Sequence, residues 1–255
     1  MTNTSYVIAF FTILAISGVF SMFGKGGGSL YTPVLVMLGL EVGAAISTAL
    51  FLNFVTAFVA TIVFTRNRLV DFKFSLIFLP GTIIGSILGA LLSARAPKDL
   101  LLGIFSLFLF GVGVLMILST KGNSRQPTRQ ISLKLSFVIV LFSFAVGVLS
   151  SLIGVGGGLI IFPFLVLYMK YPAQKAAGAN SFIVTVSSIV GTAGHFAIGH
   201  IEYFLIGVTA IATIIGSAVG SYVTVKASPS FVKVAFAFIM WFFAGQIALR
   251  LLHIL

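Results

Sequence analysis

The sequence predicts an all-α polytopic membrane protein, made of two inverted repeats of about five helical segments each. Hydrophobic residues form 59% of the 255 residues and charged residues only 7%, too few to cover a soluble protein of this size. Glycine, proline and charged residues divide the chain into apolar segments of helical length. A glycine-rich run also occurs twice, at Gly24–Gly28 and at Gly154–Gly158.

Ten apolar segments follow one another along the chain, and eight of them are long enough to cross a membrane. The second and the seventh contain only 11 residues, which as a helix reach about 16 Å against a hydrocarbon core of about 30 Å. Because each of these two follows a glycine run, we expect broken or re-entrant short helices there. The ten segments cover roughly residues 5–23, 29–39, 43–64, 74–93, 99–118, 135–153, 159–169, 175–198, 203–224 and 231–252.

The two halves of the chain are similar in sequence. Six of twelve positions are identical between residues 24–35 and 154–165, and the pentapeptide Thr82–Ser86 recurs as Thr213–Ser217. Five segments per copy is an odd number, so successive copies insert with opposite orientation. Such copies are related by a pseudo-two-fold axis in the membrane plane. The predicted division is a first membrane repeat at 1–118, a basic cytoplasmic linker at 119–134 and a second membrane repeat at 135–255.

The basic residues predict the orientation. If the ten segments alternate strictly, 12 of the 15 Lys and Arg residues fall on one face, leaving Arg95, Lys98 and Arg250 on the other. The positive-inside rule makes the first face cytoplasmic, with both termini outside. The net charge of +11 is scattered singly between apolar stretches, so we expect no nucleic-acid partner. The expected location is the cytoplasmic (inner) membrane.

The glycine runs are the first candidate site. Without a Cβ, their backbone N–H groups can point into a cavity, and the short helix that follows presents the positive end of its dipole there. An anionic substrate suits such a site, whereas the alternative is that the glycines only allow close helix packing. A phosphate-binding loop is rejected, because Lys25 does not directly precede Ser or Thr. The candidates are Gly24, Gly26, Gly27, Gly28, Gly154, Gly156, Gly157 and Gly158.

Polar side chains inside apolar segments extend this site. Lys25 supplies a point charge for an anion, or else lies at the cytoplasmic mouth and reaches water. Hydroxyl and amide groups bind substrate oxygens, or else they bond to neighbouring helices and to carbonyls of their own helix. These candidates are Lys25, Ser29, Thr48, Asn53, Asn180 and Ser181.

Proton coupling has three candidate residues, Asp71, His195 and Glu202, which lie near the predicted membrane. The alternative for both carboxylates is a structural role at a helix start. Glycines at four-residue spacing, such as Gly81, Gly85 and Gly89, favour close helix packing. The sequence has no cysteine, no metal-ligand spacing and no catalytic constellation, so we expect no enzyme, no metal and no cofactor.

Three features together resemble the sulfite exporter TauE/SafE family, also called the toluene sulfonate uptake permease family. They are the duplicated Gly-x-Gly-Gly-Gly run followed by proline, the stretches Ser47-Thr48-Ala49 and Ala179-Asn180-Ser181, and the turns Val70-Asp71-Phe72 and Ile201-Glu202-Tyr203. The resemblance covers nearly the whole chain and implies a multi-pass carrier for sulfite, sulfonates, thiosulfate or related small anions. Asn180 departs from the threonine that many members have at this position.

The resulting functional hypothesis is a secondary transporter for a small anion, working by alternating access at a midplane site. The alternatives are an anion channel and a carboxylate transporter of similar architecture. The expected partners are the small anionic substrate and the lipid bilayer, with a proton or sodium ion as the candidate coupling ion. Whether the chain forms a homo-oligomer is left open.

Overall fold

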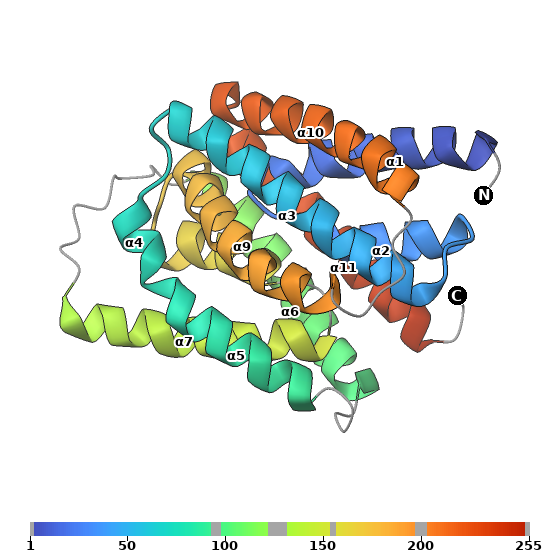
Figure 1. The fold of residues 1–255 in the computed structure, drawn as a ribbon. Coiled ribbons are helices and arrows are strands. Elements are labelled where there is room, and N and C mark those ends of the chain that lie inside the picture. The colour runs from blue at the N-terminus through green and yellow to red at the C-terminus, as the bar shows by residue number, and fades with distance from the viewer. Residues whose placement is uncertain (1–2, 93–97, 122–131, 154–156, 197–202, 253–255) are drawn as a thin grey trace.

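The computed structural model describes residues 3–92, 98–121, 132–153, 157–196 and 203–252, and all regular structure in these ranges is helical (Figure 1). The first half contains α1 (Asn3–Ser21), α2 (Gly28–Met37), α3 (Val42–Arg66), α4 (Phe72–Leu76), α5 (Phe78–Leu92), α6 (Lys98–Leu118) and the 3₁₀-helix η1 (Ser119–Lys121). The second half contains α7 (Leu133–Ile153), α8 (Gly158–Pro163), the π-helix η2 (Phe164–Tyr168), α9 (Ala173–Phe196), α10 (Tyr203–Lys226) and α11 (Pro229–Leu251).

The prediction of an all-α, multi-pass membrane protein is confirmed. Within the described residues, five apolar stretches are long enough to cross a membrane: Gly43–Arg66, Phe72–Gly89, Leu133–Leu152, Leu205–Lys226 and Pro229–Leu249. Shorter apolar helices lie at Ser5–Ser21, Gly28–Met37, Leu102–Leu118 and Gly158–Tyr168.

The sequence predicted eight long segments, and the five stretches above are those found within the described residues. Helix α9 carries many small and polar residues and packs against α3, α4, α5, α8 and α11. Helix α9 therefore lies among the other helices of the bundle.

Both predicted short helices are present and end in similar ways. Helix α2 is followed by Gly39, whose φ is +95°, and η2 is followed by Lys170, whose φ is +58°. The following amides close the two ends, with Leu40 N donating to Leu35 O and Tyr171 N donating to Leu165 O. The second closure spans one residue more, which the wider π turn accommodates, since a π turn holds an extra residue. The sequence repeat therefore has a counterpart in local structure.

The long helices pack in pairs, and each pair joins a helix of the first half of the chain to a helix of the second half. Helix α1 packs on α10, α7 packs on α5, α3 packs on α9 and α6 packs on α11. In Figure 1, α3 and α9 lie between the α1/α10 pair and the α5/α7 pair. If α1, α3, α5 and α6 correspond to α7, α9, α10 and α11, each of these four contacts has its equivalent, as a two-fold relation between the halves requires. The inversion itself stays a prediction.

Glycines set the closest of these contacts. A Cβ on Gly85 would run into the backbone carbonyl of Phe144 in α7, and one on Gly216 would run into Ser17 and Leu14 in α1. The absence of a side chain lets the paired helices approach at these points. The structure thus agrees with the packing interpretation of the glycines at four-residue spacing.

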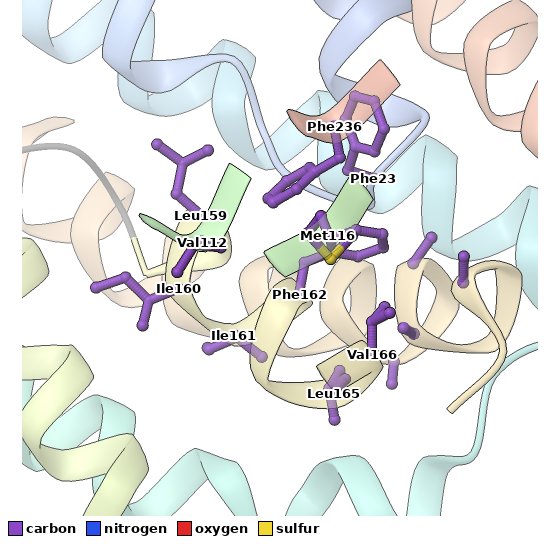
Figure 2. Close-up of a cluster of buried hydrophobic side chains, with 14 of the residues drawn as sticks. Phe23, Val112, Met116, Leu159, Ile160, Ile161, Phe162, Leu165, Val166 and Phe236 are labelled. Carbon is purple, nitrogen blue, oxygen red and sulfur yellow. The ribbon is translucent and has the colours of Figure 1, made fainter. Parts of the chain in front are cut away.

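A buried aromatic cluster fixes the region where α1 ends. The rings of Phe23, Phe162 and Phe236 have centroids 4.4 to 5.7 Å apart and come from the turn after α1, from α8 and from α11 (Figure 2). Such edge-to-face and tilted pairs are typical of well-packed aromatic cores. The cluster holds the first glycine run against the second repeat.

Candidate functional site

The first glycine turn, residues 22–27, begins as a cap of α1. Gly24 N donates to Ser21 O and Lys25 N donates to Phe20 O, with Gly24 at a φ of +63°. This is the Schellman arrangement, which needs a left-handed residue and therefore favours glycine. The predicted break after the first helix thus has a defined geometry.

The glycines of this turn are also required by close packing. A Cβ on Gly24 would meet the backbone of Ala177 and Ser181 in α9, and one on Gly26 would meet the carboxamide of Asn53. A Cβ on Gly27 would meet the Tyr31 ring. The packing alternative therefore accounts for these three positions, since protein atoms fill the space beside them.

Lys25 projects from the turn into the protein. Its side chain is only 2% exposed, and Nζ donates to Ser29 Oγ at 2.9 Å. The same nitrogen lies 4.7 Å from the Phe20 ring centroid and 5.0 Å from that of Phe243. An ammonium has three donors, and among the described residues no carboxylate forms a salt bridge with it. A buried cation of this kind suits a small anion.

Asn53 joins both repeats to the start of α2. Its Oδ1 accepts from Gly28 N at 3.0 Å, and its Nδ2 donates to Ser188 Oγ of α9 at 2.7 Å. One of the N–H groups that the sequence assigned to substrate is therefore used within the protein. Asn53 positions the N-terminus of α2 against α9.

Asn180 makes the equivalent connection from α9 to both turns. Its Nδ2 donates to Phe23 O at 2.9 Å and to Gly158 O at 3.1 Å, while the side chain is fully buried. Its Oδ1 has no donor among the described residues. A buried acceptor without a partner costs about 1–3 kcal/mol. This oxygen is therefore a candidate contact for substrate.

The second glycine run reaches the same place. A Cβ on Gly158 would lie 3.0 Å from Lys25 Cγ and 3.3 Å from Asn180 Nδ2, so these two side chains flank Gly158. Gly157 is less confined, because a Cβ there would make ordinary contacts at 3.4 to 3.7 Å. Gly154 and Gly156 lie outside the described residues. The structure thus brings Lys25, Asn180 and part of the second run together.

Ser181 and Thr48 are the remaining hydroxyl candidates, and both are buried. Ser181 Oγ donates to Gly178 O at 2.8 Å, a bond within its own helix. Thr48 is 1% exposed in α3. Their direct role in binding stays a prediction.

Of the three proton-coupling candidates, Asp71 lies at the start of α4, and the side chains of His195 and Glu202 are outside the described part of the structure. Asp71 is exposed and caps α4 by accepting from Phe74 N at 3.1 Å, as the structural alternative expected. Burial raises the pKa of Tyr171 to about 12, and the charge of nearby Asp71 adds to this rise. Glu202 lies outside the described residues, and for His195 only the backbone in α9 is described. The structure describes no group of three His, Asp or Glu side chains that would hold a metal ion.

Sequence reasoning missed several residues around this site. The Tyr31 hydroxyl bonds Thr56 Oγ1 at 2.7 Å, and Thr61 bonds Thr185 of α9 at 3.0 Å. The rings of Phe20 and Phe243 beside Lys25 were missed as well. Hydroxyl groups inside the apolar segments were a signal for the first group, but no signal distinguished two phenylalanines among 27.

Comparison with known proteins places the chain in a family. The sequence model of the sulfite exporter TauE/SafE family matches residues 9–247. The probable membrane transporter protein YunE of Bacillus subtilis is 26% identical over 78% of this chain and 81% of its own length. A probable membrane transporter protein of Methanocaldococcus jannaschii is 26% identical over 86% of both chains. No solved structure matches. The chain belongs to the sulfite exporter TauE/SafE family.

Proposed function

We propose that this protein is a secondary transporter for small anions, most directly sulfite, sulfonates or other organosulfur anions. The observation that carries the proposal is the Lys25 ammonium, which is buried where the two repeats meet and has donors to offer. A buried lysine without a carboxylate partner among the described residues is costly in a membrane protein, and such residues typically mark substrate pathways. The family match and the names of the relatives support transport.

The proposed mechanism is alternating access around Lys25. The first glycine turn belongs to one repeat, whereas Asn180 and Gly158 belong to the other, so a movement between repeats would change access to the lysine. Asn53 and Ser188 link α3 and α9 across the same boundary. When inverted repeats rock about a fixed site, the inward-facing and outward-facing states are related to each other by the pseudo-two-fold axis.

The alternatives keep the same site and differ in selectivity or rate. A lysine ammonium is a compact point charge and discriminates weakly between a sulfonate and a carboxylate. A carboxylate transporter is therefore tested beside the sulfur anions. An anion channel is tested by rate, because a channel conducts without a conformational cycle.

Uptake into proteoliposomes tests the function. The purified protein is reconstituted and offered sulfite, thiosulfate, sulfoacetate, taurine and lactate in turn, with a proton or sodium gradient imposed in separate arms. We expect saturable uptake of a sulfur anion that depends on the protein. Uptake of lactate alone would favour the carboxylate alternative, and no protein-dependent uptake of any of these anions would contradict the proposal.

We also propose a location in the cytoplasmic membrane, with residues 119–134 on the cytoplasmic side. The charge asymmetry of the sequence supports this orientation.

A further inference from the structure

The two polar atoms of the Asn180 carboxamide differ in their hydrogen bonding. Its Nδ2 donates to two carbonyls, those of Phe23 and Gly158, at 2.9 and 3.1 Å. These two bonds also fix which end of the amide is the nitrogen, because an oxygen placed there would face two carbonyl oxygens. The acceptor Oδ1 therefore points away from both carbonyls.

Oδ1 is buried and has no donor among the described residues. Asn53 provides the contrast, because its Oδ1 accepts from Gly28 N and its Nδ2 donates to Ser188. The protein satisfies both ends of one asparagine and only the donor end of the other. Buried polar groups normally have a partner, so the donor to this oxygen comes from outside the described residues, as a ligand or an ordered water.

The Asn180 side chain lies close to that of Lys25, the residue at the proposed anion site. Lys25 and Asn180 flank Gly158, with Lys25 Cγ at 3.0 Å and Asn180 Nδ2 at 3.3 Å from the place where a Cβ would lie. The side chains of Lys25, from the first repeat, and Asn180, from the second, therefore approach the same glycine. The two groups bind different parts of a ligand, because the Lys25 ammonium donates hydrogen bonds and Asn180 Oδ1 accepts them.

We propose that Asn180 Oδ1 is a specificity-determining acceptor and that the preferred substrate is an anion carrying an O–H or N–H donor. Its negative group binds Lys25 while its donor bonds Asn180. Hydrogensulfite and short hydroxyalkyl sulfonates have this chemistry, whereas plain alkyl sulfonates do not. This inference rests on the proposed function, because it concerns the substrate of the same site.

Two isosteric anions test the inference in the wild-type protein. In 2-hydroxyethanesulfonate a hydroxyl replaces the terminal methyl of propane-1-sulfonate, with the same number of heavy atoms. Competition against labelled sulfite uptake in proteoliposomes gives the affinity of each. One neutral hydrogen bond predicts about a fivefold to tenfold preference for the hydroxyl compound. Equal affinities, or a preference for the methyl compound, would overturn the inference and leave the proposed function standing.

Two matched variants assign the preference to Asn180. Asn180→Leu removes the acceptor, so the ratio of the two affinities should fall to about one or below. Asn53→Leu removes an asparagine whose ends both bond the protein, so it should weaken both anions and keep the wild-type ratio. An unchanged ratio in Asn180→Leu would refute the role of Asn180. If the wild type transports no sulfur anion at all, the proposed function itself fails.

Discussion

Replacing Lys25 with methionine should separate binding from stability. Methionine has a similar length and keeps the packing against Phe20 and Phe243, but it removes the charge and the bond to Ser29. A hydrogen bond from a charged group contributes about 1.5–3 kcal/mol. Loss of one such bond to the anion predicts affinity lower by roughly 10-fold to 150-fold.

The stability of the same variant should not fall. The lysine is 2% exposed, and replacing a buried ionic group with an apolar side chain of similar size is often neutral or stabilising by about 1–4 kcal/mol. The lost bond to Ser29 and the lost cation–π contacts, about 0.5–2 kcal/mol, offset part of this gain. We therefore expect a melting temperature equal to or higher than that of the wild type.

The assay combines thermal unfolding in detergent with sulfite uptake at several concentrations in proteoliposomes. Ser29→Ala is the matched control, because it removes the Nζ bond and leaves the charge, so its uptake should fall less than that of Lys25→Met. Uptake by Lys25→Met with wild-type affinity would refute the anion role of Lys25. A melting temperature well below that of the wild type would show that the lysine is structural instead.

Three further substitutions probe the fold and the orientation. Gly24→Ala should lower the unfolding free energy by at least about 1–2 kcal/mol, because the φ of Gly24 is +63° and the backbone of α9 lies against it. The control Gly157→Ala should lower it by less than about 1 kcal/mol. Equal melting temperatures of the two variants would contradict this. Gly85→Leu should disrupt the packing of α5 on α7 and lower the yield of folded protein. The control Gly111→Leu should be tolerated, because nothing lies within 4 Å of a Cβ at this position. A normal yield of Gly85→Leu would contradict the close contact between the two helices. Because the chain has no cysteine, Lys73→Cys gives a single thiol, which an impermeant reagent should label only from the cytoplasmic side, and labelling from outside would reverse the orientation.

The sequence predicted the helical segments well because each segment ends where apolar residues give way to charge or glycine. The segment expected at 43–64 is α3 at Val42–Arg66, and both short helices follow their glycine runs. The ends of α1 and α2 depend on left-handed glycines, which local sequence also indicates.

The contacts of the site were harder to predict because they join residues distant in sequence. Asn53 and Ser188 are 135 residues apart, and Asn180 bonds Phe23 across 157 residues. Periodicity within a segment does not specify which face meets which partner. The sequence therefore identified the two asparagines, but only the structure distinguishes the satisfied one from the one with a free acceptor.

The most direct test of the central claim is counterflow in proteoliposomes. Vesicles loaded with a high concentration of unlabelled sulfite are diluted into a trace of labelled sulfite, with no proton or sodium gradient imposed. A carrier that alternates around Lys25 should accumulate label transiently above the external concentration, and Lys25→Met should abolish this overshoot. Label that only equilibrates in the wild type would indicate a channel, and an unchanged overshoot in Lys25→Met would remove the lysine from the site.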